Sequence, residues 1–65
     1  MHSIGKTIYR LRKEMNLTQE ELADRINVTS QAISKWEREE CYPDITFLPI
    51  LADILSCSVN DFFEN

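Results

Sequence analysis

The chain has 65 residues, a net charge of −4 and hydrophobic residues at 43% of its positions. A chain of this length forms one domain, residues 1–65, and buries only about 60% of its unfolded surface. A single glycine and two prolines argue against a turn-rich β architecture. No apolar leader is present, and no stretch approaches the roughly 20 residues of a membrane span. We therefore expect an all-α, cytoplasmic protein with no membrane partner.

The charge is distributed unevenly along the chain. Residues 1–36 carry six cationic and four acidic side chains, a net of +2. Residues 37–65 carry one cationic and seven acidic side chains, a net of −6. Screening over about 8–10 Å in physiological salt isolates an acidic face from a contact face elsewhere on the molecule. The negative total therefore does not exclude an anionic partner.

The first helix is predicted over about Ser3–Glu14. Its inner face would consist of residues that recur at helical spacing, namely Ile4, Ile8, Leu11 and Met15. Gly5 costs this helix up to about 1 kcal/mol relative to Ala. Either the glycine permits the close approach of another element, or its presence is a matter of chance.

A second helix is predicted over about Gln19–Ile26. Thr18 and Glu21 fit a capping box, in which each side chain accepts a hydrogen bond from the other residue's backbone N–H. Asn27 tolerates the left-handed conformation that ends a helix. One face of the helix is apolar and consists of Leu22, Ala23 and Ile26.

A third helix is predicted over about Ser30–Arg38, with Thr29 as its cap. Ala32, Ile33 and Trp36 share its inner side, so we interpret the tryptophan as a core residue and not a stacking residue. The opposite side carries short polar groups and one cation: Ser30, Gln31, Ser34 and Lys35. Such side chains suit the reading of base edges in the major groove of DNA. The two helices and their tight turn form a helix-turn-helix pattern.

The acidic second half predicts a loop and two further helices. A loop over 39–43 ends at Pro43, which disfavours helix in the residue before it. Asp44 can cap a fourth helix over about Ile45–Leu55, in which Pro49 is tolerable because it falls near the first turn. Its inward residues would be Leu48, Leu51, Ala52 and Leu55.

Ser58 and Asp61 fit a second capping box, which would start a short fifth helix through Phe62 and Phe63. The predicted fold is therefore a compact five-helix bundle. Cys41 and Cys57, with a single histidine in the chain, cannot supply the four ligands of a zinc site, so we expect reduced thiols and no cofactor.

Residues 4–63 resemble the helix-turn-helix domain of phage repressors and Cro proteins, the XRE family. The resemblance is carried by IGKTIYRLRKEMNLTQEELADRINVTSQAISKWE and, further along, by PDITFLPILADILSCSVNDFF. It implies a lambda-repressor-like fold with the third helix in the major groove. The chain departs from the family at Asn27 and Glu39, where the family often has glycine.

The resemblance also implies roles for single residues. Contacts with DNA phosphates are expected from five residues: Thr18, Gln19, Thr29, Arg38 and Tyr42. Lys35 could contact either a base or the backbone. Arg12 and Glu37 match a pair that forms a buried salt bridge in relatives. Dimer contacts are expected after the fourth helix, with Leu55, Val59, Phe62 and Phe63 as candidates; alternatively, one phenylalanine is buried and the other partly exposed.

The functional hypothesis is sequence-specific binding of double-stranded DNA by a homodimer on a palindromic operator, as a transcriptional regulator that acts as a repressor. Weak non-specific DNA affinity is expected from the acidic second half. The alternative is an antitoxin or adaptor that uses the fold for protein–protein interaction. No Ser/His/Asp set and no glycine-rich phosphate loop exists, so an enzyme and a small-molecule ligand are not expected. The chain could also be the N-terminal part of a longer regulator.

Overall fold

The computed structural model describes residues 4–63, and it places them in four α-helices and one 3₁₀-helix. The elements are α1 (Ile4–Glu14), α2 (Gln19–Ile26), α3 (Ser30–Glu37), α4 (Phe47–Ile54) and η1 (Val59–Phe63). Between residues 4 and 63 there is no strand, so the predicted all-α class is confirmed. Within the same range, no helix combines the length and the apolar character needed to cross a membrane.

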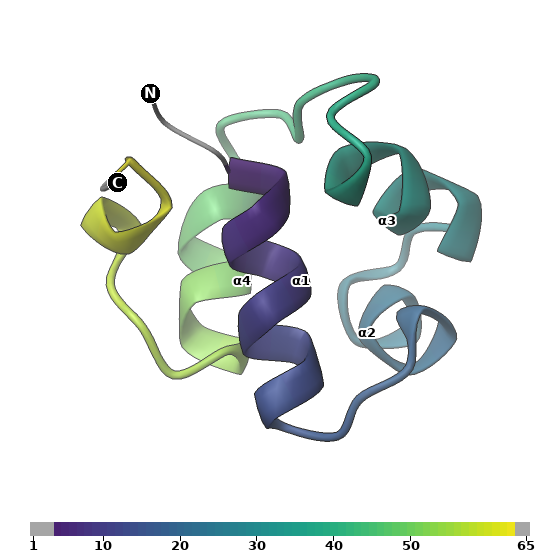
Figure 1. Cartoon of the computed structure of the whole chain (residues 1–65), viewed down its shortest axis with the longest axis horizontal. Helices are drawn as coiled ribbons and strands as arrows, with labels where there is room; N and C mark the ends of the chain where they lie inside the picture. The colour runs from purple at the N-terminus through teal and green to yellow at the C-terminus, as the bar shows by residue number, and fades with distance from the viewer. Residues whose placement is uncertain (1–3, 64–65) are drawn as a thin grey trace.

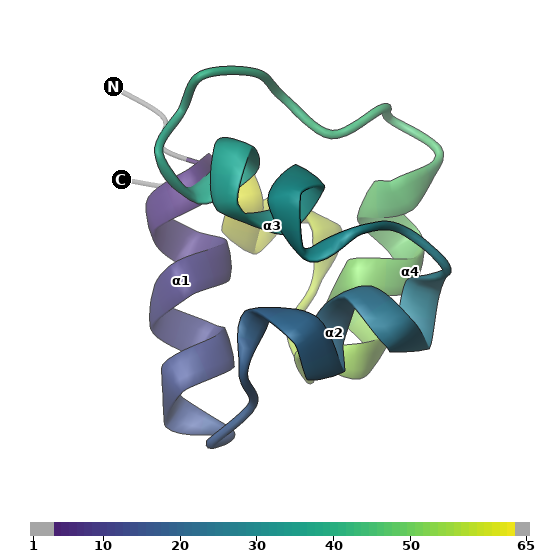
Figure 2. The ribbon, with the colours of Figure 1, turned by 90° about the vertical axis from the view of Figure 1, so that its right-hand side faces the viewer.

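The helices surround one core to which every element contributes. α3 packs on both α1 and α2, α2 also packs on α4, and η1 packs on α1 and α4. Figure 1 shows α1 in front with α3 and α2 to its right, and Figure 2 shows α1 and α4 on opposite sides of the molecule. The largest fully buried side chains come one from each element: Ile8, Leu22, Ile33, Leu51 and Phe62.

Trp36 belongs to this core, as predicted. Its side chain is buried, and its ring lies 5.5 Å from that of Phe47, measured between ring centroids. The contact joins α3 to the start of α4 across the loop that connects them. Trp36 is therefore not available to stack on a nucleobase.

Two features of α1 differ from the prediction or extend it. Ser3 lies outside the described residues, and Met15 is 39% exposed although it was expected to face inward. The helix ends at Glu14 and the chain reverses at Asn16, whose φ is 58°. The Met15 N–H still donates to the Leu11 carbonyl oxygen at 3.1 Å, but the buried residue at this end of the helix is Leu17. Gly5 permits a close approach, because a Cβ atom there would lie 2.1 Å from the carbonyl oxygen of Trp36.

The helix-turn-helix has the predicted caps. Glu21 N–H donates to Thr18 Oγ1 at 3.0 Å, and Thr18 N–H donates to a Glu21 carboxylate oxygen at 2.8 Å, so the capping box is confirmed. Asn27 ends α2 with φ 59° and ψ 43°, the left-handed region. Thr29 caps α3 by accepting a hydrogen bond from the Ala32 N–H at 3.2 Å. These caps supply hydrogen-bond partners to backbone groups that would otherwise lack them at the end of α2 and the start of α3, and they thereby fix the turn.

The predicted start of the fourth helix is wrong by two residues. α4 begins at Phe47, with Thr46 as a cap residue that makes no side-chain cap hydrogen bond. The Asp44 carboxylate instead accepts from the N–H and the hydroxyl of Thr46, both at 2.9 Å, and so closes a turn before the helix. Pro49 is consequently the third residue of α4, where a missing N–H removes no helical hydrogen bond.

The fifth element is a 3₁₀-helix and not an α-helix. The Ser58 N–H donates to the Asp61 carboxylate at 2.9 Å, which is one of the two hydrogen bonds of the predicted capping box. The Asp61 N–H donates to the carbonyl oxygen of Ser58 at 3.0 Å, where the predicted box has the Ser58 hydroxyl. The second bond spans three residues, which is the 3₁₀ pattern. α3 also ends one residue earlier than predicted, with Arg38 as its cap.

Candidate nucleic-acid interface

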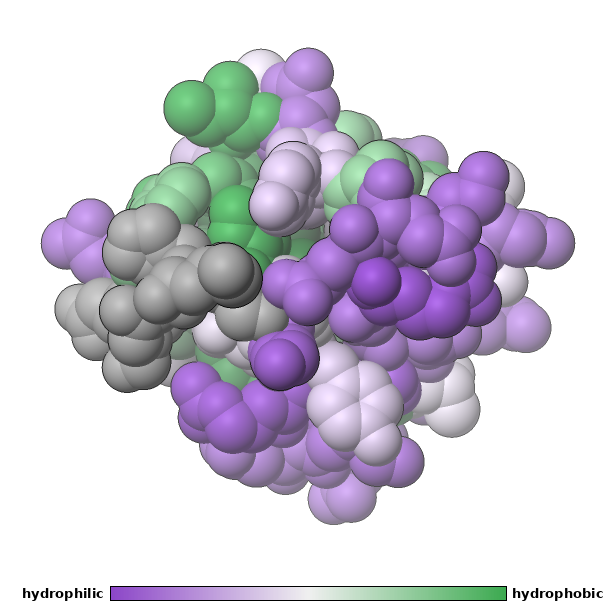
Figure 3. Space-filling model, turned by 45° about the horizontal axis from the view of Figure 1, so that its top comes forward, coloured by the Kyte–Doolittle hydropathy of each residue, from purple (hydrophilic) through white to green (hydrophobic). Residues whose placement is uncertain are grey.

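The outer side of α3 is the part of the helix-turn-helix that packing leaves uncovered. Gln31 and Lys35 are exposed and Ser30 and Ser34 are half-buried, whereas Ile33 on the inner side is completely buried. In Figure 3 the right-hand side of the molecule, where α2 and α3 lie in Figure 1, is mostly hydrophilic. All four side chains predicted to read bases therefore reach the surface, and they do so from a rigid helix.

A buried network connects α1, α2 and the end of α3. Arg12 donates from Nε and Nη2 to the two Glu37 carboxylate oxygens, at 2.7 and 3.0 Å, and from Nη1 to the Leu17 carbonyl oxygen at 2.7 Å. The Arg12 and Glu37 side chains are only 7% and 5% exposed. The hydrogen bond to Glu37 raises the pKa of Arg12, although burial opposes it. Removing one partner would leave a buried charge uncompensated, at a cost of about 3–5 kcal/mol.

Gln19 belongs to the same network, which the sequence did not indicate. Its side-chain amide donates to the Glu37 carboxylate at 2.9 Å. An amide nitrogen has two hydrogens, so one can still be donated to a phosphate oxygen while the other is held by Glu37. The network therefore fixes the orientation of a side chain at the first turn of α2, where the helix dipole favours an anion.

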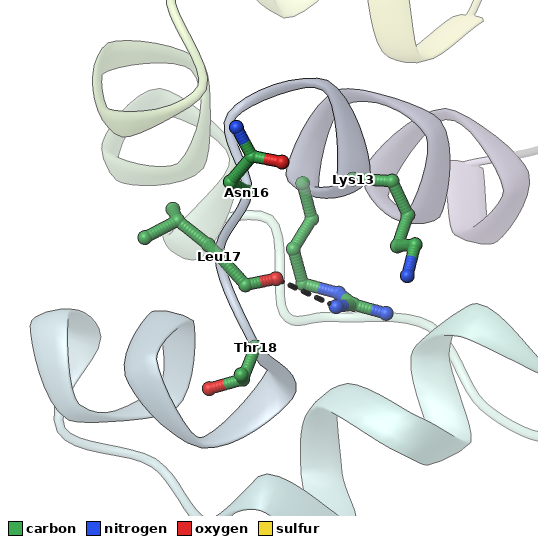
Figure 4. Close-up of a pocket in the computed structure, with 5 residues that line it drawn as sticks. Lys13, Asn16, Leu17 and Thr18 are labelled. Atoms are coloured by element: carbon green, nitrogen blue, oxygen red, sulfur yellow. Dashed lines mark hydrogen bonds between the residues drawn. The ribbon is translucent and has the colours of Figure 1, made fainter.

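A shallow pocket of about 250 Å³ lies beside this first turn. It is lined by Arg12, Lys13, Asn16, Leu17 and Thr18. Figure 4 shows the lining residues, with the hydrogen bond between Arg12 and the Leu17 carbonyl oxygen drawn as a dashed line and the Lys13 side chain labelled. Thr18 Oγ1 already accepts the capping bond, but its hydroxyl hydrogen can be donated to a phosphate. Lys13 and Asn16 line this pocket but were not singled out in the sequence, because the end of a helix and the turn after it show no periodic pattern.

Arg38 lies on the same side of α3 as the predicted base-reading residues. It donates from Nη1 to Ser34 Oγ at 2.8 Å and from Nε to the Glu40 carboxylate at 2.5 Å. Arg38 follows Gln31 by seven residues and Ser34 by four, which is the spacing of one helix face. That spacing was visible in the sequence, but only a contact with a DNA phosphate was predicted for Arg38.

The remaining predicted phosphate contacts lie at the surface. Thr29 is exposed at the start of α3, and its hydroxyl accepts the capping bond from Ala32. Tyr42 is 68% exposed in the loop between α3 and α4. Neither side chain is buried in the hydrophobic core.

The structure narrows the predicted dimer candidates. Leu55 and Phe62 are 2% and 0% exposed and belong to the core of the protomer, so they cannot supply a second interface. Val59 is half-buried and Phe63 is 39% exposed. The two adjacent phenylalanines thus divide between core and surface, which was the alternative interpretation.

Comparison with known proteins places this arrangement in a family. The helix-turn-helix family profile matches residues 8–62. The P22 c2 repressor, solved in complex with a synthetic operator, superimposes with a TM-score of 0.90 at 31% identity, over 98% of this chain and 97% of that one. SinR, a master regulator for biofilm formation solved in complex with DNA, has a TM-score of 0.82 at 33% identity, over 91% of this chain and 95% of that one.

Curated relatives agree in sequence and are longer. The HTH-type transcriptional activator BcrR of Enterococcus faecalis is 37% identical over 60 residues, which is 92% of this chain and 29% of BcrR. This chain spans less than half the length of the curated relatives that it matches. The match to the family profile and the similarity to P22 c2 extend over the capping box, the turn, α3 and α4. The chain belongs to the XRE-type helix-turn-helix family, the family of the phage repressors.

Proposed function

We propose that this chain binds double-stranded DNA sequence-specifically and regulates transcription, with α3 in the major groove. The observation that carries the proposal is the outer face of α3, where Gln31 and Lys35 are exposed while the opposite side of the helix is buried. Gln can pair with adenine through two hydrogen bonds, and Lys can donate to guanine. The superimposable P22 c2 and SinR structures contain DNA, which supports the same use of this face.

We propose that the active species is a dimer. Only two of the four base-reading side chains, Gln31 and Lys35, suit a bidentate contact, and each such contact contributes about 1–3 kcal/mol of discrimination. Operator-level selectivity requires about 4–10 kcal/mol, so two copies on half-sites about one helical turn apart meet the requirement better than one. A two-fold axis would make the operator palindromic. Binding that covers a promoter gives repression, whereas the activator name of BcrR shows that the family also contains activators.

The test begins with selection of bound duplexes from a random pool, followed by gel-shift titration of the enriched duplex. The double variant Gln31→Ala/Lys35→Ala should lose the preference for that duplex over a scrambled one. Lys6→Ala/Asn60→Ala is the matched control, because it removes the same two chemical groups from exposed positions on α1 and η1. Sequence preference that survives in the Gln31/Lys35 variant would refute the groove assignment.

The acidic second half of the chain favours one alternative, an adaptor or antitoxin that docks a basic protein. Residues 37–65 carry a net charge of −6. Salt distinguishes the two functions: the logarithm of DNA affinity falls linearly with the logarithm of salt concentration, in proportion to the phosphates contacted. An adaptor should bind no duplex even at about 50 mM salt.

A further inference from the structure

We propose that Glu40 competes with DNA for Arg38. Its carboxylate occupies the position at the Arg38 guanidinium that a phosphate or a guanine edge takes in the complex. This inference rests on the function proposed above. Arg38 donates from Nε to Glu40 at 2.5 Å and from Nη1 to Ser34 Oγ at 2.8 Å. Two of the three guanidinium nitrogens are thus engaged within the protein, by residues on both sides of Arg38 in the sequence.

The position of Arg38 makes this pair relevant to binding. Arg38 has φ −85° and ψ 0°, so the residue continues the helical course of α3 and stays on the face of Gln31 and Ser34. A cation there lies at the C-terminal end of the proposed contact surface. Any close approach of DNA to α3 brings phosphates or base edges near its guanidinium.

Carboxylate and phosphate compete for a guanidinium because both accept its N–H groups in the same planar geometry. The Nε edge is occupied by Glu40, so Arg38 cannot use that edge for DNA until the pair opens. The two side chains are 57% and 52% exposed, and an exposed ion pair is weak enough to be exchanged. After exchange, Glu40 remains beside the DNA as a repelling charge.

Glu40 differs from Asp44, another acid of this loop, in the group that it contacts. The Asp44 carboxylate accepts from the N–H and the hydroxyl of Thr46, and it therefore stabilises the turn before α4. Glu40 accepts from the cation on the contact face itself. The geometry thus gives Glu40 a role in setting DNA affinity, while Asp44 has a structural one.

The test measures the affinity of the intact chain for a duplex enriched by wild type and for a scrambled duplex, by fluorescence anisotropy. Glu40→Gln should bind both about 2- to 5-fold more tightly, a range that matches the weakness of an exposed pair. In an Arg38→Ala background the same substitution should have little effect, because the cation that Glu40 competes for is gone. This double-mutant cycle separates competition for Arg38 from a general change in charge.

Glu14→Gln is the matched control, because it removes one acid and opens the exposed Arg10–Glu14 pair, whose N···O distance is 3.2 Å. Arg10 and Glu14 are both exposed residues of α1, so this pair is not part of the outer face of α3. If Glu40→Gln matches Glu14→Gln while wild type binds duplex, the competition is refuted and the proposed function stands. If wild type binds no duplex, both are refuted.

Discussion

At the scale of single residues, Gly5 determines how closely α1 and α3 can approach. A Cβ atom at this position would lie 2.1 Å from the Trp36 carbonyl oxygen and 3.1 Å from that of Glu37. Both oxygens belong to the backbone, so relief requires a shift of the whole of α3. Gly5→Ala should therefore lower the free energy of unfolding by about 1–3 kcal/mol, although alanine favours a helix by about 1 kcal/mol. Urea denaturation measures the difference.

Lys6→Ala is the control for Gly5→Ala, since the two residues are neighbours in α1 and Lys6 is exposed. The control gains helix propensity without meeting α3, so its stability should equal or exceed that of wild type. Equal stability of the two alanine variants would show that the close approach tolerates a methyl group. The sequence left open whether Gly5 had a packing role, because the helix that it meets is distant in the chain.

Residue roles that depend on a distant partner were the hardest to predict. Gln19 was predicted as a phosphate contact, and the structure adds that Glu37, 18 residues further along, holds its amide. Glu37 serves α1 and α2 at once through Arg12 and Gln19. Spacing within one helix carries no information about such a bond, whereas it does separate the buried and exposed sides of α3.

At the scale of elements, the capping box makes the start of α2 sensitive to acid. The backbone N–H of Thr18, and then its side chain, hold the pKa of Glu21 below its ordinary value of 4.5. A lowered pKa in the folded state means that the stabilisation is complete above the unfolded value and is lost as the pH falls through the folded one. The melting temperature of wild type should therefore exceed that of Glu21→Gln most at pH 7, and the difference should shrink below about pH 4.5.

Thermal melts followed by circular dichroism from pH 7 to pH 3 test this expectation. Glu20→Gln removes a carboxylate from the neighbouring exposed position, outside the box, and serves as the control. As the pH falls, the melting temperatures of wild type and Glu20→Gln should decrease by the same amount. If the melting temperature of Glu21→Gln lay below that of wild type by the same amount at every pH, the charge of the carboxylate would contribute nothing through this cap.

The bounds of a helix were predictable where the sequence offers a capping residue at its start and a residue that tolerates the left-handed conformation at its end. α2 has Thr18 before it and Asn27 after it, and its predicted bounds are those of the structure. α4 was placed too early, because Asp44 suits a cap but bonds to Thr46 within a preceding turn. The fifth helix was predicted without a type, since five residues give no periodicity that separates 3₁₀ from α.

At the scale of the whole molecule, the distribution of charge along the chain bears on where DNA and where a second copy of the protein can bind. The net charge of +2 in residues 1–36 comes from α1, which carries four cationic side chains and one acid, whereas residues 18–36 carry two cations and three acids. The net of −6 in residues 37–65 disfavours DNA at the second half of the chain. A second copy that packs on residues 37–65 would not compete with DNA, but both copies carry the same negative charge there, so the contact has to come from apolar side chains. This arrangement fits a dimer in which both copies turn α3 toward the same duplex.

Phe63 is the residue with which the proposed dimer can be tested, because it is 39% exposed while the neighbouring Phe62 is completely buried. Burying a phenylalanine contributes about 1.5–3 kcal/mol, and a two-fold interface contains it twice. Because only the exposed 39% of each side chain remains to be buried, Phe63→Asp should weaken dimerisation by roughly 10- to 50-fold in sedimentation equilibrium. Binding of one protomer to a single half-site should be unchanged.

The control for Phe63→Asp is Ile45→Asp, which adds the same charge at an apolar residue that is 75% exposed and lies before α4. Ile45 is more exposed than Phe63, so exposure alone would predict the larger effect there. A dimer through η1 predicts the opposite order, with Ile45→Asp close to wild type. Equal self-association of the two variants and wild type would remove η1 from the interface, and the half-sites would then have to be bridged by another part of the protein.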